Sequence, residues 1–432
     1  MKSKVWTLVS IFLFLPGLAR AQMQDMGSMQ EMNHPPKNEK SGSLAEVLEH
    51  HATSGTDAQP ASTPSQMLMT NWHAWMWMLH GEVFLNDVQQ SGPRGADKMF
   101  STNWIMPMAQ RRFANGRLTF KAMLSFEPAT ITQKRYPELF QQGETAFGRQ
   151  IVDGQHPHDF FSELAAIYDY KLNPNTLLSL YAAPMGDPAM GPNAYPHRGS
   201  ASENPMAPLS HHLQDSTHVA DDVVTVGVTH ANFRLEASGF HGREPGEYRW
   251  NVDSGKIDSW STRATVNPGA NWSLQYSIAQ LHSPEELAPE VDIRRMTASV
   301  AYNRPITSGN WASLFAWGRN QSLEDGNVGN GYLLESTLKF MKRNYAWTRI
   351  ENADRTNELL LGENSEPPGF RERYLTRVQA YTVGYDREFG RIPHLSTAFG
   401  GQVTWYGIPE VLKPVYGQHP VGVVLFLRIR AH

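Results

Sequence analysis

Short segments of this chain alternate between apolar and polar residues from about residue 67 to the C-terminus. In one of them Trp272, Leu274, Tyr276 and Ile278 are separated by single serine or glutamine residues. Successive side chains of a β-strand point to opposite faces, so this period of two predicts strands with one apolar and one polar face. The alternation therefore predicts an all-β structure over residues 67–432.

The pattern predicts about sixteen strands. Their ranges are 72–84, 100–113, 117–127, 162–172, 176–183, 222–231, 233–242, 257–267, 271–281, 293–303, 311–320, 332–341, 345–351, 374–388, 395–406 and 420–430. The alternation is weaker over 311–320 and 374–388, so 14 and 18 strands remain alternatives.

The connections between these strands alternate in length. Short turns are predicted at 115–116, 173–175, 232, 268–270, 307–309, 342–343 and 391–393, and long loops at 85–99, 128–161, 184–221, 243–256, 282–292, 321–331, 352–373 and 407–419. This alternation is typical of an even-stranded, closed antiparallel transmembrane β-barrel with short periplasmic turns and long outer loops. A soluble two-sheet sandwich is the alternative, but a sandwich does not require strict alternation. The barrel places both termini in the periplasm.

The first residues have the features of a secretory signal peptide. Lys2 and Lys4 precede an apolar run at 5–15, and Ala19-Arg20-Ala21 has the small-x-small pattern of a cleavage site. A membrane anchor is the alternative, but a spanning helix needs about 20 apolar residues. We therefore expect a signal peptide over 1–21 and a mature chain from Gln22. Residues 22–66 are polar and predict a disordered periplasmic segment, with one short helix near 43–51.

Composition excludes several classes of function. The chain has no cysteine, which excludes disulfides, thiolate zinc sites, iron–sulfur clusters and cysteine nucleophiles. Its formal net charge of −4 gives no support for a nucleic-acid partner. No nucleophile elbow, phosphate-binding loop or dinucleotide fingerprint is present. We expect no enzymatic activity; an outer-membrane hydrolase using Ser210, His211 and Asp215 remains an alternative.

Most of residues 67–432 resembles the Gram-negative outer-membrane β-barrel proteins. The resemblance rests on the signal peptide, the absence of cysteine, the hairpin pattern and the β-rich final segment 421–430. It implies a location in the outer membrane, contact with its lipid and a porin-like role in passing small solutes or metal ions. Such families usually end in an aromatic residue, whereas this chain ends in Arg430-Ala431-His432 and its last aromatic residue is Phe426.

A methionine-rich tail follows the predicted cleavage site. Its candidate metal ligands recur at every third residue and end in a histidine: Met23, Met26, Met29, Met32 and His34. Thioethers are soft donors that select Cu(I). The tail is similar to the methionine-rich segments of copper-handling proteins, including the copper resistance B family of barrels, and this resemblance implies copper as the bound ion. A linker of accidental composition is the alternative.

Two predicted long loops are rich in histidine. The first carries His156 and His158, and the second carries His197, His211, His212 and His218, all near aspartates. If both loops fold inward, imidazoles and carboxylates could bind Cu(II), Zn(II) or Ni(II). A hydrogen-bonded polar plug is the alternative. These segments also resemble an uncharacterised family of exported proteins, and that likeness implies no activity.

Arginines recur within the predicted strands, among them Arg234, Arg263, Arg349 and Arg428. A charge on the lipid face is costly, so we expect these arginines to face the lumen and pair with carboxylates such as Glu236, Glu335 and Asp386. The sequence thus predicts an outer-membrane channel or porin-like transport protein linked to copper or another transition metal. A copper-sequestering protein with a plugged barrel is the alternative. The pattern sets neither the solute nor the oligomeric state.

Overall fold

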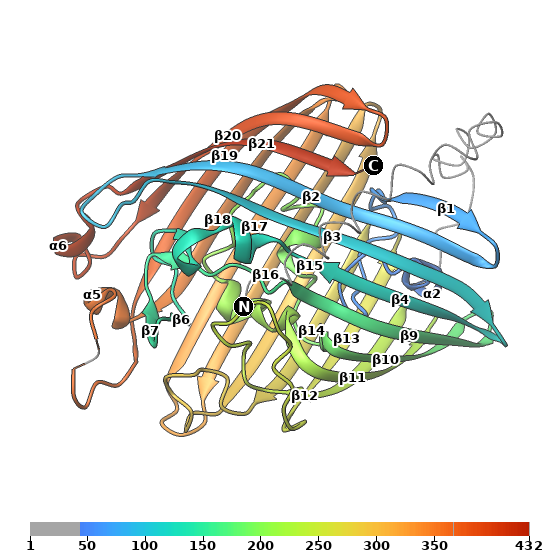
Figure 1. Cartoon of the computed structure of the whole chain (residues 1–432), viewed down its shortest axis with the longest axis horizontal. Coiled ribbons are helices and arrows are strands. Elements are labelled where there is room, and N and C mark those ends of the chain that lie inside the picture. Colours follow the sequence, from blue (N-terminus) through green and yellow to red (C-terminus); the bar gives the residue numbers. More distant parts are fainter. Residues whose placement is uncertain (1–43, 366, 432) are drawn as a thin grey trace, which may run out of the picture. The chain divides into compact units, whose positions relative to one another are not determined.

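Sixteen antiparallel strands close into a β-barrel in the computed structural model, which describes residues 44–365 and 367–431 (Figure 1). Each strand pairs with the next along the chain, and the last, β21, pairs with the first, β2. All sixteen predicted strands are confirmed. They are β2 Trp75–Gln90, β3 Lys98–Phe113, β4 Gly116–Leu124, β9 Phe161–Asn173, β10 Thr176–Gly186, β11 Ala220–His230, β12 Phe233–His241, β13 Ser259–Gly269, β14 Trp272–Leu281, β15 Ile293–Ile306, β16 Gly309–Ser322, β17 Val328–Phe340, β18 Asn344–Thr356, β19 Tyr374–Ile392, β20 Leu395–Gly407 and β21 Val421–Ala431.

The remaining elements are short; β1 pairs with the start of β2, and the others are not part of the sixteen-stranded sheet. The strands are β1 Leu68–Trp72, β5 Tyr136–Pro137, β6 Glu144–Ala146, β7 Arg149–Ile151 and β8 Gly154–Gln155. The helices are α2 Leu44–Leu48, α3 Glu127–Thr130, η3 Thr132–Lys134, η4 Tyr195–His197, α4 His211–Gln214, η5 Ser216–His218, α5 Glu358–Leu361 and α6 Lys413–Tyr416. In this part of the chain, no helix is long and apolar enough to cross a bilayer.

The connections alternate between short turns and longer loops, as predicted. Seven turns of two or three residues join the strands at one rim, and eight loops join them at the other. The loops at 91–97 and 323–327 are shorter than expected because β2, β16 and β17 extend further than their alternation shows. The two longest loops, 125–160 and 187–219, carry most of the predicted metal ligands. Strand β2 begins and β21 ends at the rim that holds the short turns.

The outer face of the wall is apolar and the inner face is polar. On β17, Tyr332, Leu334 and Leu338 are exposed on the outside, whereas Glu335 and Thr337 between them are buried inside. On β11, Val224, Val226 and Val228 are exposed in the same way. An apolar band around a closed barrel is suited to lipid, and the barrel satisfies its backbone hydrogen bonds without an open edge.

Residues 44–66 differ from the predicted disordered segment, because the structure places them against the inner wall. The helix α2 forms as expected, and its Leu44, Ala45 and Leu48 are buried. Farther on, Asp57 pairs with Arg263 on β13, and Ser62 Oγ donates to the carbonyl oxygen of Asn303 at 2.8 Å. Buried polar partners on distant strands thus order a segment with few apolar residues. Residues 1–43, with the predicted signal peptide and Met23, Met26, Met29, Met32 and His34, lie outside the described residues.

We expect the lipid-facing side of the wall to reject charge. Replacing Leu334, near the middle of β17, with arginine should lower the free energy of unfolding in lipid vesicles by about 2–4 kcal/mol, because an arginine there must enter the apolar band. The measurement is urea unfolding of the folded barrel. The control is Leu287→Arg in the loop 282–292, where the same change should cost little. Equal losses at both positions would contradict the assignment of the outer face.

Candidate functional site

The two longest loops bring their histidines together inside the barrel. Helix α4, in the loop 187–219, rests on the wall at Gly318 and Gly331, which pair directly across β16 and β17. A Cβ atom at Gly318 would lie 2.0 Å from the carbonyl oxygen of Leu213, and one at Gly331 would lie 2.8 Å from Cβ of Ser210. Only glycine lets the helix backbone approach this closely. The glycine pair therefore fixes the depth at which His211 and His212 enter the lumen.

Five of the six predicted loop histidines form one cluster. The ring centroid of His211 lies 5.1 Å from that of His212 and 5.3 Å from that of His218. His158 lies 5.5 Å from His218, and His156 lies 6.2 Å from His212. The first loop supplies two of these rings and the second supplies three. Both loops therefore fold inward, which was the condition for their imidazoles to share a site.

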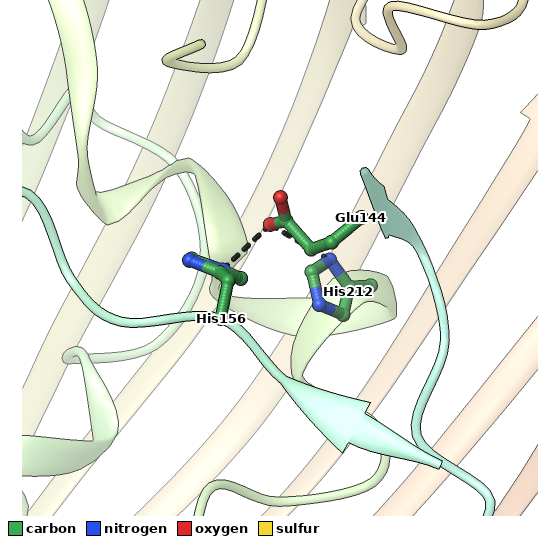
Figure 2. A group of neighbouring side chains, drawn as sticks. All are labelled: Glu144, His156 and His212. Atoms are coloured by element: carbon green, nitrogen blue, oxygen red, sulfur yellow. Dashed lines mark ion pairs between the residues drawn. The ribbon is translucent and has the colours of Figure 1, made fainter. Parts of the chain in front are cut away.

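Glu144, His156 and His212 form the part of this cluster that could hold a metal ion (Figure 2). Their donor atoms lie within 4.8 Å of one another. The carboxylate lies between the two rings, with Glu144 Oε1 at 2.7 Å from His156 Nε2 and 3.9 Å from His212 Nδ1. Nε2 of His212 is buried and has no hydrogen-bond partner among the described residues. Two imidazoles and a carboxylate are donors that suit Cu(II), Zn(II) or Ni(II).

Burial and nearby charges set the protonation of these groups. Burial lowers the pKa of His211 and His212, in spite of their carboxylate neighbours. Burial, together with His211 and His158, lowers the pKa of His218 to about 3. Burial opposes the charge on His158, but its 3.0 Å contact with Glu127 raises the pKa above the ordinary value. Three of the five rings are thus held in the neutral form that binds metals.

His197 lies apart from the cluster, toward the short-turn end. Its Nε2 is 3.4 Å from Sδ of Met123, and its ring lies 4.7 Å from Trp104 and 6.1 Å from His80. Met123 belongs to a cluster of six methionines that the sequence analysis did not select. They are Met67, Met76, Met78, Met106, Met108 and Met123. The strands β2 and β3 each carry two methionines at a spacing of two residues, and this spacing in the sequence could have identified the cluster.

A network of buried ion pairs fills much of the remaining lumen, as expected from the strand arginines. Arg349 Nε lies 3.3 Å from Glu335 on the neighbouring strand, and Arg198 Nη1 in the inward loop lies 3.1 Å from the same carboxylate. Arg198 also pairs with Asp215, which in turn accepts from His211 at 2.8 Å. The loop that carries the histidines is therefore joined electrostatically to the barrel wall.

A second group of ion pairs lies where the barrel closes. Arg428 and Arg430 of β21 both pair with Glu203, at 2.6 and 2.9 Å, and Arg430 pairs with Glu82 of β2 at 2.5 Å.

The hydroxyl of Ser210, in the predicted hydrolase trio, donates to Gln214 Oε1 at 3.0 Å. The structure gives no serine–histidine hydrogen bond here within the described residues, so the hydrolase alternative gains no support from this trio.

Three cavities in the packed lumen adjoin one another through shared lining residues. The largest, of about 450 Å³, is at the short-turn end and is lined by His80, Trp104 and His197. A second, of about 30 Å³, shares Trp104 with it and is lined by His158. The third, of about 20 Å³, shares His158 and is lined by Glu144 and His156. The two small cavities have room for one or two water molecules each, which is too narrow for a larger solute.

Removing the arginine that joins the loop to the wall should destabilise the barrel strongly. We expect Arg198→Met to lower the free energy of unfolding by about 3–5 kcal/mol, because Asp215 and Glu335 would each lose a buried partner. The control is Arg377→Met on β19, whose pair with Asp354 is partly exposed and should contribute less than about 1 kcal/mol. Urea unfolding in detergent micelles measures both. Losses of similar size would show that the loop is not anchored through Arg198.

The barrel is similar in fold to solved outer-membrane porins. An anion-selective porin from Comamonas acidovorans matches with a TM-score of 0.52 and 10% sequence identity, over 82% of this chain and 99% of that chain. OmpF of Salmonella typhi, solved with daunomycin, matches with a TM-score of 0.49 and 8% identity, over 84% and 100% of the two chains. A loop-deletion mutant of OmpT, an outer membrane protein of Vibrio cholerae, matches with a TM-score of 0.47 and 7% identity, over 82% and 99%. No protein-family model and no curated protein matches the sequence. The match to the Comamonas acidovorans porin shows a likeness of fold alone, and the strand pairing of this chain itself gives the closed sixteen-stranded barrel.

Proposed function

We propose that this chain is an outer-membrane transport protein whose lumen is closed to general solutes in the state described here. The observation that carries the proposal is the series of three adjoining cavities, which runs from the histidine cluster to the short-turn rim and narrows to the size of a few water molecules. Such a route fits a small ion better than a sugar or a peptide. The apolar outer face supports insertion in the outer membrane. In this orientation the short turns, the start of β2 and the end of β21 lie on the periplasmic side.

The segment 44–66 is part of the closure. Its Thr56 donates to Glu236 at 2.5 Å, Lys121 Nζ lies 3.2 Å from the carbonyl oxygen of Gly55, and Ser62 contacts Asn303. These contacts join one short segment to strands on several parts of the wall. Because the segment enters from the end where β2 begins, it can leave the lumen without breaking any strand pairing. Asp57, Gln59 and Thr63 of the segment line a cavity beside Arg263 and Asn303 of the wall. We infer that displacement of the segment opens a wider route there, past the two narrow cavities.

The conductance of the folded protein in a planar bilayer tests this proposal. The intact chain should show little or no steady conductance, because the cavities along the route are too narrow. A variant that lacks residues 44–66 should show larger and more frequent conductance steps. Steady porin-like conductance of the intact chain would contradict the closure. A deletion variant that folds, as judged by heat-modifiable gel mobility, and yet stays silent would contradict transport along this route.

A cross-link provides a matched control. The chain has no cysteine, so Ser62→Cys combined with Asn303→Cys introduces a single pair whose parent side chains are in contact. The oxidised double variant should conduct no more than the intact chain, and reduction should remove any difference between it and the single variants.

A second candidate function is the binding of a divalent transition metal at the histidine cluster. The arrangement of Glu144, His156 and His212 supports it, and His158, His211 and His218 lie close enough to adjust the coordination. Copper is one of the ions that fit these donors, in its divalent form. The methionine-rich tail at Met23–Met32 and His34 stays a separate prediction for Cu(I).

Metal titration of the folded protein tests the cluster. Glu144→Gln and His212→Ala should each weaken Cu(II) or Zn(II) binding at least about tenfold, because each removes one of the three converging donors. His282→Ala is the control, since that imidazole is largely exposed and pairs with Asp292 in another loop. A titration that is the same for all three variants would contradict a metal site at the cluster.

A further inference from the structure

An inward patch of six methionines lies near the short-turn rim, five of them on three neighbouring strands. Met76 and Met78 are on β2, Met106 and Met108 are on β3, and Met123 is on β4. Met67, just before β1, covers them from inside the lumen. Met78 lies directly across from Met108 in the strand register. We call these six residues the methionine patch.

Packing alone does not account for the composition of this patch. Every buried apolar side chain of the cluster is a methionine: Met67, Met78, Met106, Met108 and Met123. Each of the other buried clusters in the described chain contains leucine, isoleucine, valine or phenylalanine, with at most one methionine. Branched and aromatic side chains fill a core with better-defined rotamers than methionine does. What the methionines share and leucine lacks is a thioether sulfur.

Two imidazoles adjoin the patch with unused donor atoms. His197 lies 3.4 Å from Sδ of Met123 through Nε2, and its Nδ1 is buried without a hydrogen-bond partner in the described part of the chain. Nδ1 of His80 is buried and unpartnered in the same sense. Met67, His80 and His197 all line the cavity of about 450 Å³, which also reaches Thr307 and Ser308 in a short turn. An ion entering at this rim can therefore reach Met67 and both rings, and Sδ of Met123 adjoins His197 in the wall of the cavity.

The lining of this cavity, as far as the structure describes the chain, offers no unpaired carboxylate to a divalent ion, and it also carries Lys342 and the paired cations Arg198, Lys339 and Arg430. The carboxylate that lines the same cavity, Glu82, is already paired with Arg430, and Glu163 is paired with Lys121 at 3.3 Å. The donors that remain are neutral thioethers and imidazoles. This set differs from the one at Glu144, where a carboxylate lies between two imidazoles. Neutral soft donors suit a soft ion of single charge.

We propose that the methionine patch, with His197 and His80, binds a soft monovalent metal ion, Cu(I) or Ag(I), at the wall of the short-turn cavity. The site is separate from the methionine-rich tail and from the divalent-metal cluster. It does not depend on the proposed transport function, because an ion can bind in this cavity whether or not the lumen conducts.

Silver binding to the full mature chain tests the proposal, since Ag(I) needs no reductant. The tail is first silenced by replacing Met23, Met26, Met29 and Met32 with serine, so that its own binding does not mask the site. In this background we expect one tightly bound Ag(I) per chain. Met123→Leu should weaken that binding at least about tenfold. Leucine nearly conserves the volume of methionine, so the packing should change little.

Two further variants keep the test decisive. Met99→Leu is the matched control, because Met99 is 79% exposed and lies outside the patch. If Met123→Leu fails to fold, Met67→Leu replaces it, since Met67 precedes the barrel wall and lies at the end of the patch. X-ray absorption of the Cu(I)-loaded protein should show sulfur and nitrogen neighbours together. No tight Ag(I) site in the tail-silenced chain, or equal affinities for the patch variants and Met99→Leu, would overturn the proposal.

Discussion

Closure of the barrel through the pairing of β2 with β21 is the constraint on which the rest of the structure depends. A closed sheet satisfies its backbone hydrogen bonds without an edge, and each strand must then present alternate side chains to lipid and to lumen. The outward positions are apolar, as along β11. The inward positions are largely polar or charged, and a buried charge is tolerated only when it is paired. Some inward charges pair within the wall, as Arg349 does with Glu335, and others pair with chain that enters the lumen.

Two inserted segments supply such partners. Residues 44–66 bring Asp57 to Arg263, and the loop 187–219 brings Arg198 to Glu335 and Glu203 to Arg428. The loop 125–160 is held to another loop instead, through the pair of Glu144 with Arg249. Each contact joins residues far apart in sequence. The same contacts fix the positions of the histidines, because Asp215 is held by Arg198 and accepts from His211. Filling the lumen and assembling the candidate metal ligands therefore have one physical cause.

The sequence predicted the wall well and the interior only in part. A period of two is a local signal, so all sixteen strands and the alternation of turns and loops could be predicted without knowledge of their partners. The histidine-rich loops could be recognised by composition, but not Glu144, which becomes a candidate ligand only because β6 brings it to His156 and His212. Residues 44–66 look disordered in isolation, since their stabilising partners lie as far away as Arg263 and Asn303. The methionine patch carries a local signal as well, because Met76 and Met78 are two residues apart on one strand and Met106 and Met108 are two residues apart on the next. Whether these sulfurs form a metal site depends on His197, which comes from a distant loop.

The two proposed metal sites differ in a way that bears on what could pass between them. The cluster at Glu144 offers imidazole and carboxylate, whereas the patch near His197 offers thioether and imidazole, so a single ion of fixed charge should prefer one site over the other. Copper is the exception, because its divalent form suits the first set and its monovalent form suits the second. Movement of copper from the first site to the second would require a reductant, and movement in the other direction would require an oxidant; the side chains at the two sites supply neither. Each site therefore selects its own metal ion by charge and softness. The narrow cavity between the two sites, lined by Tyr195 and Trp104, limits only the size of an ion that could move from one to the other.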